Sequence, residues 1–91
     1  MKDLPKHLFA YKRTPEFEEN SIPKGLRRGH ATKAGTWALI VVLEGRLLYR
    51  ILEPAAEELI LTPKISGVVE PTVRHEVEAI GEVRFYVEFY Q

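Results

Sequence analysis

Short runs of strand-forming residues, each ended by turn residues, constrain the fold of this 91-residue chain more than any other feature. The runs cover residues 8–11, 26–30, 36–43, 46–52, 58–62, 68–69, 75–80 and 83–90. They recur at the spacing of about 8–12 residues that is typical of β-sandwiches and β-barrels. The sequence therefore predicts one all-β domain over residues 1–91, with seven or eight strands and no helix longer than about two turns.

The most apolar run, residues 36–43 (TWALIVVL), is followed directly by Glu44-Gly45. Its near-continuous apolar character indicates burial on both faces or a place in a barrel wall. Glu44-Gly45 predicts a two-residue turn, so that residues 36–43 pair with residues 46–52 as a hairpin. Gly81-Glu82 predicts a second hairpin near the C-terminal end.

Composition excludes several classes of protein. Thirteen basic and thirteen acidic side chains cancel, whereas a nucleic-acid-binding domain of this size usually carries a basic excess. The absence of cysteine excludes a disulfide scaffold, a thiolate metal site and a cysteine nucleophile. The N-terminus has no apolar signal-peptide core, and the longest apolar run is too short to span a bilayer. We expect a soluble cytoplasmic protein that binds neither nucleic acid nor membranes.

The three histidines differ in their predicted positions. His75 shares a strand face with Val77 and Ala79, so its ring is predicted to point inward. His30 lies on a mixed face, which predicts a place near the mouth of a barrel, and His7 is predicted to lie on the surface. His75 is either a hydrogen-bonded core or rim histidine, or a metal ligand or general base.

A metal site needs at least three protein ligands, so the two histidines would need an acidic partner. The candidates are Glu70, Glu78 and Glu88. Glu70 lies just before the turn that leads to His75 and could share its end of the barrel. Glu88 alternates with the phenylalanines and shares a face with Tyr86 and Tyr90, so it points outward if the phenylalanines fill the core. The pattern leaves this choice open.

The predicted metal ligands are therefore His30, His75, Glu70 and Glu88. Imidazole and carboxylate together suit zinc, iron, nickel or manganese. The nine aromatic residues should mostly be core, but Trp37 and Tyr86 are expected to line a mouth that holds an apolar or planar small molecule. Common catalytic signatures, such as a phosphate-binding glycine loop or a G-x-S-x-G elbow, are absent.

Four segments carry a resemblance to a known family: residues 23–37 (PKGLRRGHATKAGTW), residues 42–47 (VLEGRL), Glu70-Pro71 with residues 74–79 (RHEVEA), and residues 87–90 (VEFY). Together they resemble the TehB/YeaR-like family, a small cupin-type domain found alone or ahead of the methyltransferase domain of the tellurite-resistance protein TehB. The resemblance extends from about residue 5 to residue 90. The string H-x-T-K-x-G-T-W is its most specific part.

The resemblance implies a cupin double-stranded β-helix, that is, a small jelly-roll barrel. In many cupins, two histidines and a glutamate of a first motif join a histidine of a second motif around a metal. His75 corresponds to the second-motif histidine. Ala38 stands where the first-motif glutamate would fall, and His30 is the histidine nearest to the expected pair. The methyltransferase portion has no counterpart here, so methyl transfer to tellurite is not expected of this chain.

Three functions fit these observations, because one fold hosts many functions. The first is a binding domain for a small ligand or oxyanion, with or without a divalent metal, in a tellurite-resistance or stress-related role. The second is a metal-dependent cupin enzyme of the dioxygenase or isomerase kind. The third is a non-catalytic structural or regulatory interaction domain. A homodimer is expected as well, because a small barrel with a strongly apolar strand often covers its free edges in this way.

Overall fold

The computed structural model describes all residues from Met1 to Gln91 and contains six strands and one short helix. The elements in chain order are β1 (Ala10–Arg13), β2 (Phe17–Glu18), α1 (Lys24–Arg27), β3 (Trp37–Ile51), β4 (Glu57–Leu61), β5 (Gly67–Val69) and β6 (His75–Tyr90). The predicted all-β class is confirmed, and the single helix is one turn long. No helix in the structure has the length and apolar character that crossing a membrane requires.

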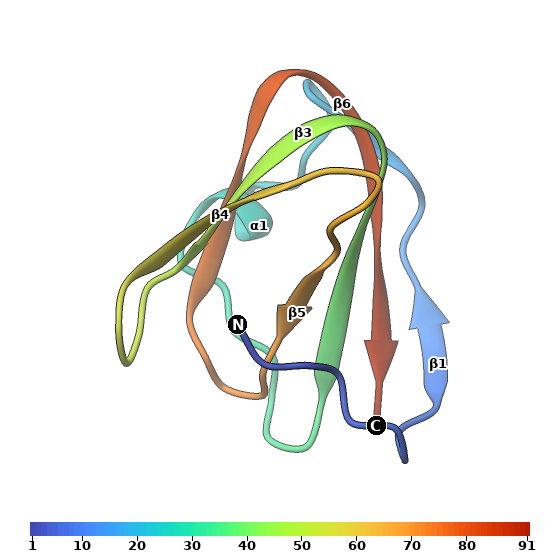
Figure 1. The fold of residues 1–91 in the computed structure, drawn as a ribbon, viewed down its shortest axis with the longest axis vertical. Coiled ribbons are helices and arrows are strands. Elements are labelled where there is room, and N and C mark those ends of the chain that lie inside the picture. Colours follow the sequence, from blue (N-terminus) through green and yellow to red (C-terminus); the bar gives the residue numbers. More distant parts are fainter.

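All six strands belong to one antiparallel sheet, whose main order is β1-β6-β3-β4, with β2 beside β6 and β5 beside β3. The two long strands β3 and β6 form its centre. They pair along almost their whole length, from Trp37 opposite Tyr90 to Ile51 opposite His75. Figure 1 shows both strands arching over the same end of the molecule, so the sheet folds back over itself.

The two predicted hairpins are wrong. β3 runs through Gly45 and β6 runs through Gly81, and neither glycine reverses the chain. Gly45 has a φ of 82°, and the register between β3 and β6 shifts on both sides of it. These shifts are β-bulges, which bend a strand instead of ending it. Four expected runs thus merge into two long strands. With the run over residues 26–30 lost and β2, which was not expected, gained, the sheet has six strands and not seven or eight.

The strand predicted over residues 26–30 is also wrong. Residues Lys24–Arg27 form α1, in which the Leu26 N–H donates to the Pro23 carbonyl at 3.0 Å. Only His30, at the end of this segment, enters the sheet, as an isolated bridge to His75. The expected runs at residues 8–11, 58–62 and 68–69 correspond to β1, β4 and β5 within a few residues.

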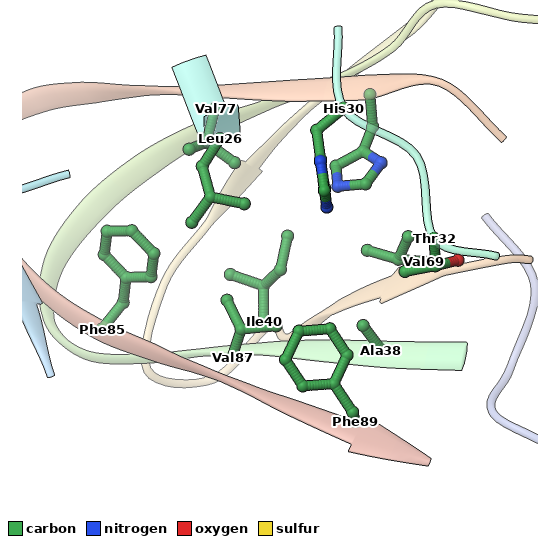
Figure 2. A pocket seen from close by; sticks show the side chains of 11 residues that line it. Leu26, His30, Thr32, Ala38, Ile40, Val69, Val77, Phe85, Val87 and Phe89 are labelled. Atoms are coloured by element: carbon green, nitrogen blue, oxygen red, sulfur yellow. The ribbon is translucent and has the colours of Figure 1, made fainter. Parts of the chain in front are cut away.

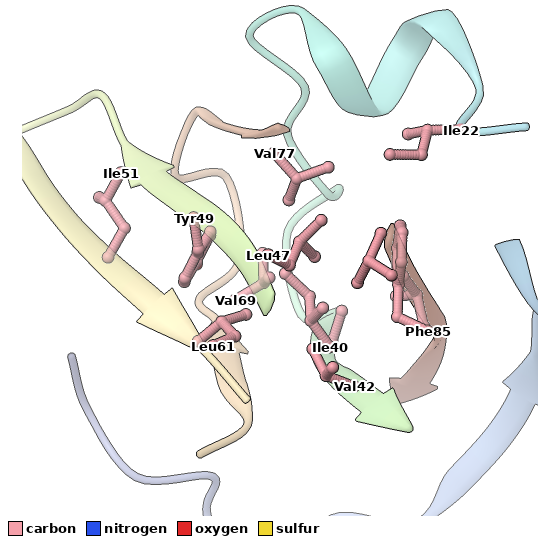
Figure 3. Packing of buried hydrophobic residues seen from close by; sticks show 13 residues of the cluster. Ile22, Ile40, Val42, Leu47, Tyr49, Ile51, Leu61, Val69, Val77 and Phe85 are labelled. Carbon is pink, nitrogen blue, oxygen red and sulfur yellow. The ribbon is translucent and has the colours of Figure 1, made fainter. Parts of the chain in front are cut away.

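The core lies between the two halves of the folded sheet. It contains thirteen buried apolar residues, several of which Figure 3 labels. Ten of them come from β3 and β6, and the others are Ile22, Leu61 of β4 and Val69 of β5. Tyr49 and Phe85 are fully buried. Burying side chains of this size stabilises a fold by about 1.5–3 kcal/mol each. The Tyr49 hydroxyl donates to the Val68 carbonyl at 2.9 Å, so it ties β3 to β5 across the core.

Candidate functional site

An apolar pocket lies inside the folded sheet, next to the segment that follows α1. Leu26, Ile40, Phe85 and Phe89 are among the eight hydrophobic residues that line it, and Figure 2 shows their side chains around the space. Its polar residues are Thr32 and the two histidines, His30 and His75. The volume open to the centre of a water molecule is about 20 Å³, which is room for about one water.

His30 and His75 form a pair at the pocket wall. The backbone N–H of His30 donates to the His75 carbonyl at 2.7 Å, and the N–H of His75 donates to the His30 carbonyl at 2.8 Å. The ring centroids lie 5.5 Å apart in an edge-on arrangement with an interplanar angle of 77°. His75 points inward, as predicted, and is 3% exposed.

The surroundings of His75 decide its protonation. Burial lowers its pKa, a hydrogen bond to the Val73 carbonyl acts in the opposite direction, and the charge of His30 lowers it further. The ring is therefore neutral at pH 7. Nδ1 lies 3.2 Å from the Val73 carbonyl oxygen, and because a carbonyl can only accept, Nδ1 carries the proton. Nε2 is left as a hydrogen-bond acceptor within an apolar environment.

None of the predicted carboxylates joins this histidine pair in a metal site. Glu70 lies 3.5 Å from the Lys2 ammonium. Glu88 accepts hydrogen bonds from the Tyr90 hydroxyl at 2.7 Å and from the Arg13 guanidinium at 2.8 Å, and both lower its pKa. Glu78 pairs with Arg50 at 3.0 Å. No group of three or more histidine or acidic side chains is placed to hold a metal ion, so these residues do not fit a metal centre of three protein ligands.

Trp37 and Tyr86, the predicted ligand-binding aromatics, do not line the pocket. Each alternates with pocket residues along its strand and lies on the opposite face of the sheet. The Arg13 guanidinium stacks on the Tyr86 ring at 4.3 Å from its centroid. Phe85 and Phe89 of β6 line the pocket instead, so the phenylalanine face of β6 is the inner one. Glu88, which alternates with them, therefore points outward, and this answers the question that the sequence left open.

An open groove of about 280 Å³ adjoins the pocket and shares His30, Thr32 and Phe89 with it. Its other lining residues are Tyr11, Lys12, Ala31, Lys33 and Thr36. Sequence reasoning missed Lys12, Lys33 and Thr36 as site residues. The signal that could have found two of them is the H-A-T-K-A-G-T string, because five of its seven residues line this groove.

These features define a small all-β domain with an apolar pocket whose polar lining consists of Thr32 and two bridged histidines. The family model for the TehB-like domain matches residues 12–87, and the chain belongs to this family.

Two curated relatives come from strains of Haemophilus influenzae, and both are named probable S-adenosyl-L-methionine-dependent methyltransferase TehB. The protein of strain ATCC 51907 is 34% identical over 83 residues, which cover 87% of this chain and 29% of the relative. The chain thus spans less than a third of the length of the curated relatives that it matches. The methyltransferase name belongs to those longer proteins.

Two solved structures share the fold. The crystal structure of TehB from Haemophilus influenzae has a TM-score of 0.86 and 32% identity, over 93% of this chain and 32% of that one. A crystal structure of an Escherichia coli K12 protein has a TM-score of 0.87 and 21% identity, over 100% of this chain and 97% of that one. The second likeness concerns the fold alone.

Proposed function

We propose that this domain binds a small, largely apolar molecule in the pocket beside His30 and His75. The observation that carries this proposal is the buried imidazole of His75, whose Nε2 is an acceptor among apolar side chains. Nε2 accepts no hydrogen bond within the chain, and a ligand hydroxyl or N–H would provide a donor for it inside the pocket. By its family, we further propose that the role of the domain is related to tellurite resistance or stress.

Ligand entry requires the pocket to widen, because the enclosed space holds about one water. The wall formed by α1 is the part that can move. α1 is a single turn with no side-chain cap and no buried residue, and it contributes Leu26 to the pocket. Isolated helical turns are marginal, and segments with few buried contacts open at low free-energy cost. A ligand would therefore displace Leu26 and leave the rigid sheet unchanged.

The cupin-type double-stranded β-helix remains part of this proposal. The arch of β3 and β6, with the core between the two halves of one sheet, supports such an arrangement. A cupin metal enzyme is not proposed, because the two imidazoles have no third ligand beside them. We also propose that the domain supplies binding and that methyl transfer belongs to the remaining length of the TehB relatives.

A fragment titration tests the pocket. Phenol combines an apolar ring with one hydroxyl donor, and toluene has the same ring without the donor. In ¹H–¹⁵N spectra of the whole chain, we expect phenol to shift the amides of residues around Leu26, His30 and His75, and to bind more tightly than toluene. His75→Phe keeps the ring and removes the acceptor, so it should abolish the preference for phenol, while the surface variant His7→Phe should keep it. If phenol leaves the pocket amides of the wild-type chain unchanged at millimolar concentration, the proposed function fails.

A further inference from the structure

We propose that Lys12, Lys33 and Thr36 form a subsite for an anionic head group, so that the ligand of this domain is a small amphipathic acid. Its carboxylate or phosphate oxygens would lie in the open groove, and its apolar body would reach the pocket. This inference rests on the proposed function, since it names the chemical class of the molecule that the pocket takes.

The groove and the pocket form one continuous site. They share His30, Thr32 and Phe89, which come from the segment after α1 and from the end of β6. The pocket is closed and apolar, whereas the groove is open and measures about 280 Å³. A molecule that bridges them needs an apolar end and a hydrated polar end.

The charge of the groove is unopposed. Lys12 and Lys33 both line it, neither belongs to any of the nine ion pairs of the chain, and no acidic residue lines the groove. A second groove shows the contrast, because its charged lining residues are four glutamates and one arginine: Glu18, Glu19, Glu44, Glu82 and Arg84. In a chain whose formal charges cancel, the groove beside the histidines therefore carries a local positive field that attracts anions.

Thr36 provides an independent observation. It is 4% exposed, lines the same groove, and its Oγ1 is the one buried side-chain polar atom without a hydrogen-bond partner in the chain. A buried hydroxyl without a partner is unfavourable, and an anionic oxygen is a strong acceptor for it.

The turn that carries Thr36 is well defined. The Thr36 N–H donates to the Lys33 carbonyl at 3.1 Å, and Gly35 has a φ of 82°, the value that the third residue of a type II turn requires. The Thr32 hydroxyl donates to the Thr36 carbonyl at 2.8 Å. The turn thus pairs the Thr36 N–H and carbonyl and the Thr32 hydroxyl, and it leaves the Thr36 hydroxyl without a partner.

Matched probes test the subsite. Benzoate and benzamide have the same ring and nearly the same shape, but only benzoate is charged, and inorganic phosphate has the charge without the apolar body. In ¹H–¹⁵N titrations we expect benzoate to bind at least about fivefold more tightly than benzamide at low salt, because two exposed charge contacts contribute modestly. This advantage should shrink at high salt, since exposed charges are screened.

Three variants assign the effect to residues. Lys12→Gln with Lys33→Gln should bring benzoate to the affinity of benzamide and leave benzamide unchanged. The matched control, Lys6→Gln with Lys64→Gln, removes the same charge from exposed lysines outside the groove and should retain the benzoate preference. Thr36→Val should weaken benzoate without lowering the melting temperature, because it removes a hydroxyl that has no partner in the chain.

The outcomes separate the two proposals. Equal binding of benzoate and benzamide, or a benzoate preference that survives the groove double variant, would overturn the subsite and leave the pocket in place. Lysine-dependent binding of phosphate, with no effect of either organic probe on the pocket amides, would support the anion subsite and overturn the pocket. Failure of all three probes would overturn both.

Discussion

His30 and His75 are joined twice through their backbones, with each N–H donating to the carbonyl of the other, and their rings lie edge-on 5.5 Å apart. This bridge fastens the segment after α1 to the first residue of β6, which is the far end of the central strand pair. The groove, the pocket and the buried imidazole therefore meet at one pair of residues. A change in the charge of His75 acts on all three.

The first prediction concerns pH. The pKa of His75 lies below its ordinary value of 6.5 in the folded chain, mainly because of burial. At a pH between the pKa of His75 in the folded chain and its pKa of about 6.5 in the unfolded chain, the unfolded state binds more protons than the folded state. Stability therefore falls as the pH falls below about 6.5. The free energy of unfolding should rise with pH over that range, with a slope below the one-proton limit of about 1.4 kcal/mol per pH unit. Urea unfolding from pH 7.5 down to pH 5 measures it.

Two variants isolate the contribution of His75. His75→Phe removes the titrating group and should flatten the profile in the range just below pH 6.5, whereas His7→Gln, at an exposed position, should leave the slope unchanged. A wild-type chain whose stability is constant from pH 7.5 to pH 5 would contradict the assignment of a neutral, buried imidazole.

Strand alternation correctly predicted the inward position of His75, because Val77 beyond it marks the buried face unambiguously. Alternation gives no such answer for Trp37, because both faces of the first half of β3 are apolar and both are at least half-buried. Where each face of a strand is apolar, alternation shows that two faces exist but not which one faces the core. The candidate ligands Glu70 and Glu88 lie in ion pairs with cations that are distant in the sequence, which no local pattern reveals.

The glycines were misread for a different reason. A residue with positive φ is required both in a tight turn and in a bulge, so the local sequence at Gly45 and Gly81 is the same for either structure. The pairing of β3 with β6, which involves residues up to 53 positions apart between Trp37 and Tyr90, decides between them. Whether each glycine forms a tight turn or a bulge therefore depends on tertiary structure, and the residues next to it do not reveal which one forms.

The second prediction compares these two glycines. Both have positive φ, but a Cβ at Gly45 would collide with the Glu82 carbonyl oxygen, whereas a Cβ at Gly81 would meet open space. Gly81→Ala should cost about 1–2 kcal/mol from the left-handed backbone alone. Gly45→Ala should cost more than about 3 kcal/mol, because two backbone segments must also separate. Chemical denaturation of both variants checks the difference, and equal losses would argue against the close approach of β3 and β6 at the bend.

The third prediction concerns the buried hydroxyl of Tyr49. Tyr49→Phe removes its hydrogen bond to Val68 and leaves a carbonyl without its partner in the core. The expected loss is about 1–3 kcal/mol in the free energy of unfolding. Tyr11→Phe is the control, because Tyr11 is 47% exposed, and its loss should stay within about 0.5 kcal/mol. Burial also raises the pKa of Tyr49 strongly, so its ionisation should be absent from an absorbance titration at ordinary alkaline pH.

The last prediction is the homodimer expected from the sequence, which the structure of one chain leaves as a prediction. β4 pairs with β3 alone, so one of its edges is free, and Ile60 on this strand is 48% exposed. An unpaired edge with an exposed apolar side chain is the feature through which two copies of a sheet protein commonly associate. We expect sedimentation velocity to give a dimer at about 100 µM and Ile60→Lys to give a monomer. Ile65→Lys is the matched control, because Ile65 has the same 48% exposure but lies in the turn after β4. A wild-type chain that sediments as a monomer, or a dimer that survives Ile60→Lys and not Ile65→Lys, would show that β4 is not the dimer edge.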